Sequence, residues 1–241
     1  MHFTRFWSIV EATHDISNPC TPQKLDRLID LMGFRADQHI LDIGSGRGWL
    51  DTRIAERTGA RITAIEINPW FNQVARLRAQ HAGVHQRIDI IEADGHTVTL
   101  TDQTYDAGLC IGASFAVGGL APLLDTLRRV VKPGGLIAVG DIFRLTDTLP
   151  AALDELGPVP TLAGLVDQIR GDHEPLEMLV APLEDWDRYE TRKWQTAQQW
   201  IAANPTDHEH DDFVTAIAKM RHDYLHYERP HIGWAIVVAR V

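Results

Sequence analysis

The stretch ILDIGSGRGWL, residues 40–50, decides the fold of this chain. An apolar run typical of a β-strand carries one acid, Asp42, and passes into three glycines at alternate positions, Gly44, Gly46 and Gly48. A helical pattern follows over residues 49–58. Glycine lets the backbone of such a strand-turn-helix unit take positive φ and lie flat against a ligand. The turn therefore predicts a seat for a nucleotide-containing cofactor, and a purely structural turn is the alternative.

Two later β-type runs also end in acids. RITAIE, from Arg61, ends in Glu66, and RIDIIEAD, from Arg87, ends in Asp94 and is followed by Gly95. Glu66 lies about twenty residues past the glycine turn, the distance at which one βαβ unit brings a carboxylate to a ribose. Three consecutive strands are thus predicted to present Asp42, Glu66 and Asp94 along one carboxyl edge.

Details of the turn argue against a dinucleotide cofactor. The dinucleotide pattern is G-x-G-x-x-G, whereas here the third glycine comes one residue early and bulky Trp49 takes its place. Asp42 would also repel a pyrophosphate at the mouth of the site. A cationic cofactor that has a ribose and no phosphate fits better, and S-adenosylmethionine (SAM) is such a cofactor.

The motifs DIGSGRG (42–48), Glu66, Asp94 with Gly95, and KPGG (132–135) together resemble class I SAM-dependent methyltransferases. The resemblance covers most of the chain, and it is nearest to poorly characterised bacterial small-molecule methyltransferases. It implies that loop 42–48 holds the amino-acid part of SAM, Glu66 the ribose, and Asp94 the adenine amino group. The implied cofactor-binding residues all lie where strands end: Asp42, Gly44, Ser45, Gly46, Gly48, Glu66, Ile67, Asp94, Gly95 and Ile111.

The same resemblance places residues 111–115 against the transferred methyl group. Small residues in that segment also suit close packing, and this alternative stays open. Asp141, at the end of the fifth strand, offers either a substrate contact or a cap. The candidate substrate-binding residues are Trp7, Ser114, Phe115, Asp141, Trp186 and Tyr189.

A general base is needed only where the nucleophile carries a proton of high pKa. His14 and Asp15, in the N-terminal loop, are the candidate catalytic residues. Phe3, Phe6 and Trp7 stand at helical spacing before that loop. We expect residues 1–34 to form N-terminal helices that act as a lid over the site, and the alternative is a helix simply packed on a sheet face.

Strand-helix alternation predicts a parallel sheet with right-handed connections. Counting LEMLVAPL, from Leu176, and the C-terminal HIGWAIVVARV, the fold class is a Rossmann-like, doubly wound, seven-stranded α/β sheet. It is mostly parallel with an antiparallel last strand and has helices on both faces. We expect one domain over residues 1–241, with a helical insertion at 184–230 that contributes to substrate selection.

The composition of the chain limits the kinds of partner that it can bind. The formal net charge of -10 argues against nucleic acid, because that partner requires Lys and Arg to neutralise phosphates. No stretch approaches the length needed to cross a bilayer, so no membrane partner and a cytoplasmic location are expected. A small-molecule substrate follows, and the oligomeric state stays open.

No metal site is expected. The run from His208 to Asp212 resembles a solvated helix start, where acids favour the helix dipole. His222 and His226 have zinc-like spacing, but no third ligand is evident.

Two alternatives to methylation remain from sequence. One is a SAM-using enzyme of the same fold that cyclises or cleaves the cofactor instead of methylating a substrate. The other is a non-catalytic SAM-binding module. Fold resemblance does not separate them.

Overall fold

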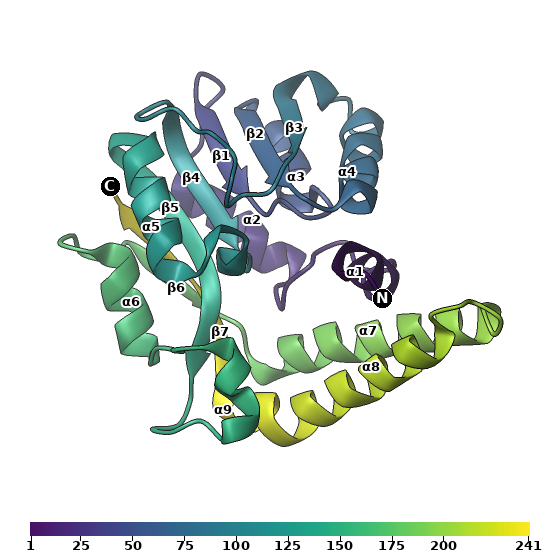
Figure 1. The fold of residues 1–241 in the computed structure, drawn as a ribbon. Helices are drawn as coiled ribbons and strands as arrows, with labels where there is room; N and C mark the ends of the chain where they lie inside the picture. The colour runs from purple at the N-terminus through teal and green to yellow at the C-terminus, as the bar shows by residue number, and fades with distance from the viewer.

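A seven-stranded sheet in the order β3-β2-β1-β4-β5-β7-β6 runs through the centre of the molecule (Figure 1). The structure is a computed structural model that describes all 241 residues. The strands are β1 (His39–Ile43), β2 (Arg61–Glu66), β3 (Ile88–Glu92), β4 (Tyr105–Ile111), β5 (Val131–Arg144), β6 (Glu177–Val180) and β7 (Ile232–Arg240). Only β7 is antiparallel to its neighbours, β5 and β6. The predicted seven-stranded sheet with an antiparallel last strand is confirmed.

The helices alternate with the strands as the sequence pattern predicted. They are α1 (Phe3–Val10), α2 (Pro22–Met32), α3 (Trp49–Thr58), α4 (Pro69–His81), α5 (Leu120–Val130), α6 (Leu162–Arg170), α7 (Leu183–Ala203), α8 (His210–Asp223) and α9 (Arg229–His231). Short 3-10 helices lie at His85–Arg87, Ser114–Val117 and Ala151–Leu156, and a π-helix at Tyr224–Glu228 joins α8 to α9. No helix is both long enough and apolar enough to cross a membrane.

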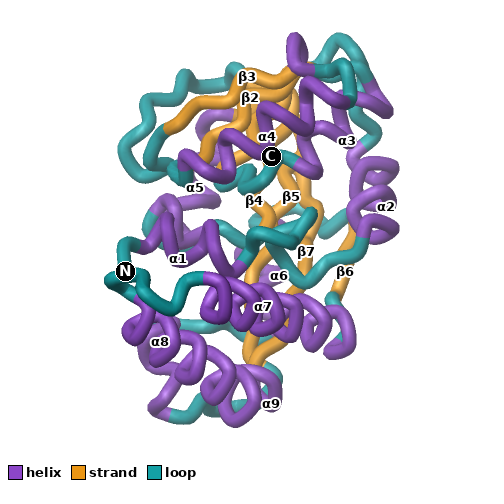
Figure 2. The backbone as a smooth tube through the Cα atoms, turned by 90° about the vertical axis from the view of Figure 1, so that its right-hand side faces the viewer, coloured by secondary structure: helices purple, strands orange, loops and turns teal.

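Two hydrophobic clusters hold the helices to opposite faces of the sheet. Leu28 of α2 and Ile54 of α3 belong to one cluster, and Leu127 of α5 and Leu165 of α6 belong to the other. Figure 2 shows the helices on either side of the strands. Both faces are covered because the strands are apolar on both sides, as in doubly wound sheets.

The chain reverses its direction of travel across the sheet between β1 and β4. It passes outward through β2 and β3, then returns to place β4 beside β1. Helices on either side of this switch point diverge, so a crevice opens at the carboxyl ends of the two strands. Asp42, the penultimate residue of β1, and Ile111, the last residue of β4, lie at that crevice.

The sequence also predicts that KPGG (132–135) lies between the helix and the fifth strand and that residues 144–160 form a loop, and the structure differs at both places. The segment KPGG (132–135) does not separate helix from strand, because β5 begins at Val131, directly after α5. The pairing with β4 shifts register between Tyr105 and Ala107, so the glycines form an irregular start to the strand. The expected loop at 144–160 contains the short 3-10 helix Ala151–Leu156.

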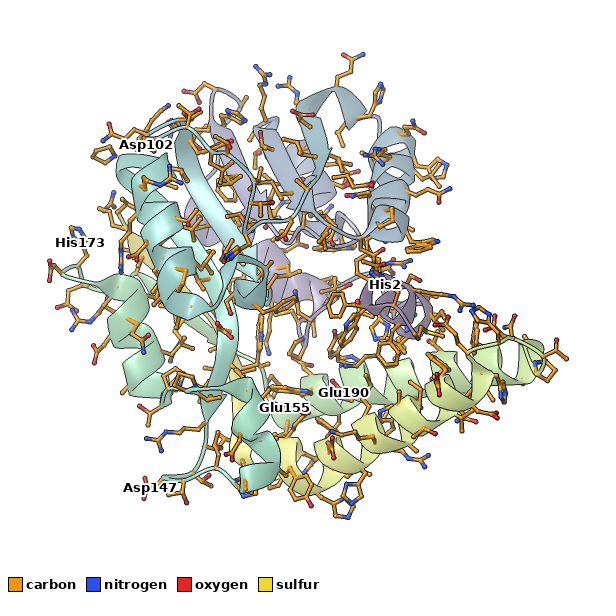
Figure 3. All side chains as sticks on the ribbon, viewed as in Figure 1. His2, Asp102, Asp147, Glu155, His173 and Glu190 are labelled. Carbon is orange, nitrogen blue, oxygen red and sulfur yellow. The ribbon has the colours of Figure 1, made fainter.

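Below the carboxyl edge, α7 and α8 form a long antiparallel pair, and α1 lies between this pair and the sheet (Figure 1). A small cluster joins them, with Val10 of α1, Ala197 of α7 and Phe213 of α8 all fully buried. Side chains crowd the space between α1 and α7, near the labelled Glu190 (Figure 3). The N-terminal helix and the insertion therefore pack as one layer.

We expect Phe213→Ala to lower the free energy of unfolding by about 3 kcal/mol, because a fully buried ring leaves a cavity. Urea denaturation measures this loss. Val214→Ala, at the exposed neighbouring position, is the matched control and should cost less than about 1 kcal/mol. Similar losses in the two variants would contradict close packing of the cluster.

Candidate functional site

A cavity of about 470 Å³ opens at the switch point. Its floor is the carboxyl ends of β1, β2 and β4, and its cover is α1 with the loop that follows. Sixteen of its 32 lining residues are hydrophobic, so it is a mixed surface of the kind that binds organic ligands.

The glycine turn brings the backbone close to its neighbours. Gly44 has φ of +74°, and a Cβ at this position would lie 2.2 Å from the Cβ of Ala113. Gly48 has φ of +68°, and its Cβ would lie 2.6 Å from that of Ala75. Both positions exclude a side chain, both sterically and through the left-handed backbone. The turn is thereby held at the mouth of the crevice.

Glu66 is fixed by backbone donors at the end of β2. Its Oε2 accepts a hydrogen bond from the Gly46 N–H at 2.9 Å, and its Oε1 accepts one from the Asn68 N–H at 2.8 Å. Burial raises the pKa of the Glu66 carboxyl, and these hydrogen bonds oppose that rise. The acid is therefore tied to the glycine turn that it faces.

Asp42 shares its buried environment with a second acid, Asp51, in the first turn of α3. Both are almost completely buried, and the two carboxyl groups act on each other's charge. Burial, together with the charge of Asp51, raises the pKa of Asp42 well above its usual range. Burial raises the pKa of Asp51 to about 7. A pair of this kind shares a proton until a cation takes its place.

Unpartnered polar atoms converge on the cavity. Buried polar groups nearly always have hydrogen-bond partners, so a cluster without them marks a ligand site. Twelve buried side-chain atoms in the chain lack a partner, and six of them belong to cavity-lining residues. These six atoms are Glu11 Oε2, Ser17 Oγ, Asn18 Oδ1, Asp42 Oδ1, Ser45 Oγ and Arg47 Nε.

The N-terminal loop is tied down across the glycine turn. Arg47 donates from Nη2 to the Ala12 carbonyl at 3.1 Å, and Arg78 on α4 forms an ion pair with Asp15 at 2.6 Å. Phe3 of α1 meets Phe115 edge to face, with ring centroids 6.4 Å apart. These contacts close the cavity from the side opposite the sheet.

A buried carboxylate enters the cavity from α1. Glu11 is 3% exposed, and its Oε1 accepts a hydrogen bond from the Tyr189 hydroxyl on α7. Burial and the neighbouring Glu11 charge raise the pKa of Tyr189 well above its usual range, so the phenol keeps its proton. The pair joins the N-terminal cover to the insertion at the wall of the cavity.

The cavity gathers most of the residues named from sequence. Those that line it are Trp7, Asp15, Asp42, Gly44, Ser45, Gly46, Glu66, Ile67, Asp94, Gly95, Ile111, Phe115 and Tyr189. Those outside its lining are His14, Gly48, Ser114, Asp141 and Trp186. Asp94 lies in the loop after β3, where its Oδ1 accepts from the His96 N–H at 2.9 Å.

Packing explains why three of these side chains lie elsewhere. Asp141 accepts a hydrogen bond from the Ile142 N–H at 2.7 Å, and Ser114 lies close enough to oppose the rise that burial causes in its pKa, so this acid acts as a local cap. Trp186 is buried between α7 and the π-helix, with its ring 6.5 Å from that of Tyr224. These positions serve the fold around the cavity.

His14 lines a smaller neighbouring cavity of about 270 Å³. Its Nε2 lies 3.1 Å from the Tyr189 carbonyl, which only accepts, so Nε2 carries the proton. Burial lowers the pKa of His14 to about 4. The imidazole is thus neutral near pH 7 and holds the backbone of α7 behind Tyr189, away from the main cavity.

Sequence reasoning missed several residues of the site, including Glu11, Arg47 and Asp51. Two of them carry a signal that could have found them. Glu11 stands four residues after Trp7 and directly follows buried Val10 at the end of α1, and Asp51 stands beside buried Leu50 in the first turn of α3. An acid on the buried face of a helix is uncommon unless it has a function or a partner.

The acid and histidine run after α7 holds the N-terminal helix α1 against the insertion. Arg5 on α1 forms ion pairs with Asp207, at 2.6 Å, and with Glu209. Asp207, His208 and Glu209 do have ligand atoms within 4.8 Å of one another. His222, at the end of α8, stacks on His226 of the π-helix, with ring centroids 4.3 Å apart, and both are exposed. The ion pairs give the acids of this run a structural role at the end of α1.

Known proteins share this arrangement. Residues 40–135 match a methyltransferase domain family. A SAM-dependent methyltransferase from Thiobacillus denitrificans, solved in complex with S-adenosyl-L-homocysteine, is 29% identical, with a TM-score of 0.88 over 99% of this chain and 98% of that chain. The uncharacterized protein YjhP of Escherichia coli is 31% identical over 98% of both chains, and its X-ray structure matches with a TM-score of 0.86.

A further relative is named for its reaction. The ubiquinone biosynthesis O-methyltransferase of Aeromonas salmonicida is 32% identical over 141 residues, which are 58% of this chain and 58% of that protein.

We expect Asp51→Asn to stabilise the protein at about pH 8 and to change little at about pH 4. The carboxyl has a raised pKa when folded, so it lowers stability progressively as pH rises from about 4, where the unfolded chain ionises, to about 7, and the loss is complete above that. The gain at the higher pH should be roughly 2 to 4 kcal/mol. Thermal unfolding at both pH values measures it.

Glu56→Gln, an exposed position on the same helix, is the control and should leave the pH profile unchanged. Parallel profiles for the wild type and Asp51→Asn would show that Asp51 is not held in a proton-sharing pair.

Proposed function

The chain belongs to the class I SAM-dependent methyltransferases, and from that membership we propose that it methylates a small organic molecule held in the main cavity. One observation carries the proposal: the acid of the glycine turn, Asp42, is buried with an unpartnered oxygen at the switch point. A positively charged hydrogen-bond donor would satisfy such an oxygen.

The residues present fit SAM. We assign the ammonium of its amino-acid part to Asp42, and its carboxylate to Arg47, whose buried Nε has no partner. Glu66 would exchange its backbone donors for the ribose hydroxyls. Asp94 and Ile67, both at the rim of the cavity, would border the adenine. When bound, SAM supplies an electrophilic methyl group on a sulfonium.

The protein's task is then alignment and exclusion of water, since the sulfonium is a good leaving group. We assign both to α1 and the loop after it, as a lid. Phe3, Trp7 and Phe115 give the cavity an apolar wall beside the cover, and the Arg78 to Asp15 ion pair holds that cover in place. A lid built on one helix can open without disturbing the sheet.

The substrate class follows from size and charge. A covered cavity of this volume suits a metabolite, and the charge of -10 disfavours a polyanion. The relative from Aeromonas salmonicida is named for methylation in ubiquinone biosynthesis, which involves a small molecule. The insertion supplies Tyr189 to the wall, so we assign it a part in substrate selection.

Incubation with SAM and a panel of small metabolites, read by mass spectrometry, tests the proposal. We expect one class of compound to gain a single methyl group, in step with formation of S-adenosylhomocysteine. Consumption of SAM to a product other than S-adenosylhomocysteine, with no compound gaining a methyl group, would indicate cyclisation or cleavage of the cofactor instead. Tight binding of SAM without turnover of any compound would indicate a binding module.

A further inference from the structure

Glu11 is the one buried acid of the cavity wall that the proposed cofactor contacts do not use. Asp42, Glu66 and Asp94 face the SAM assignments above, and Asp15 is exposed and paired with Arg78. Glu11 comes instead from the lid and lines the same cavity. Its charge acts on Arg47 and Glu66, so its carboxylate lies near the groups assigned to the cofactor and has no assigned contact of its own.

The geometry of Glu11 leaves one oxygen free for a ligand. The Tyr189 hydroxyl occupies Oε1, while Oε2 is buried without a partner. Glu11 forms no ion pair, although its charge acts on the guanidinium of Arg47. Burying a carboxylate without an ion-pair partner costs desolvation free energy, so a positively charged ligand at this oxygen would lower that cost.

Aromatic rings surround this oxygen. Trp7 and Tyr189 line the cavity, and both rings already interact with a cation: the Lys193 ammonium lies 5.3 Å from the Trp7 ring centroid and 4.4 Å from that of Tyr189. Lys193 is neutralised by Glu190 at 2.6 Å and is not part of the cavity lining. The cavity-facing sides of these rings remain available to a ligand. Ring faces attract cations, so they add to the pull of the carboxylate.

We propose that Glu11, Tyr189 and Trp7 form an ammonium-binding subsite, and that the methyl acceptor carries a positively charged amine. The Glu11 Oε2 accepts a hydrogen bond from the ammonium, Tyr189 fixes the carboxylate, and Trp7 covers the charge. A carboxylate placed this way discriminates against neutral analogues, because they leave it unpaired. The inference rests on the proposed function, since it names the substrate class of that site.

Binding of benzylamine and of benzyl alcohol, which differ in charge and little in shape, tests the subsite. Calorimetry on the full chain saturated with S-adenosylhomocysteine gives both dissociation constants. We expect benzylamine to bind at least ~10-fold more tightly. Glu11→Gln should bring the two affinities to within about twofold, and Tyr189→Phe should keep the preference, because the carboxylate is still present. Glu56→Gln is the control for loss of a surface acid.

Equal affinities in the wild type, no binding of either compound, or a preference that survives Glu11→Gln would each overturn the subsite. The wild-type comparison decides the matter even where the Glu11 variant fails to fold. Failure of the wild type to bind S-adenosylhomocysteine would count against the proposed function instead. The same pair of titrations without S-adenosylhomocysteine would then still test the ammonium preference.

Discussion

The site depends on one unfavourable arrangement, the burial of the Asp42 carboxyl beside Asp51 at the switch point of the sheet. Two acids in contact away from water cannot both be ionised without a cation nearby. The fold holds them there because β1 ends at this point and Gly44 brings the turn against Ala113. The backbone thus holds two buried acids in an electrostatically unfavourable arrangement, and a cationic ligand would lower that cost.

The rest of the cavity follows from where the strands end. Glu66 is positioned by pairing of β2 with β1, so its carboxylate lies beside the same glycine turn. Since the sheet supplies only one side of the crevice, the N-terminal helix and the insertion must supply the other. Their shared cluster around Phe213 makes them one layer, and the Glu11 to Tyr189 hydrogen bond is where that layer reaches the cavity.

Local signals made the sheet and most helices predictable. The helix α2 shows this: the Thr21 hydroxyl accepts from the Lys24 N–H at 3.2 Å, and Gly33 ends the helix in the left-handed conformation. KPGG was harder, because its strand pairing is set by β4, about thirty residues earlier in the chain. The glycines of KPGG indicate a turn, but the long-range pairing with β4 makes the segment the start of β5.

The roles of side chains in the lid were harder to predict from the sequence than the fold. The gathering of Asp42, Glu66 and Asp94 at one cavity could be predicted, because strand ends bring acids together by topology alone. The direction of His14, however, depends on α7, and Glu11 meets a partner 178 residues away. No spacing rule connects positions so distant, and the insertion that carries Tyr189 has no fixed place in the strand-helix alternation. Contacts across such an insertion emerge only when the layers are packed.

The most direct measurement of the central claim is the number of protons released when S-adenosylhomocysteine binds at about pH 6.5, below the pKa of Asp51. Calorimetry in two buffers of different ionisation enthalpy gives this number. If the ligand's ammonium replaces the proton shared by Asp42 and Asp51, the wild type should release up to about one proton, and Asp51→Asn clearly fewer. Tight binding with no proton release in the wild type would contradict the account.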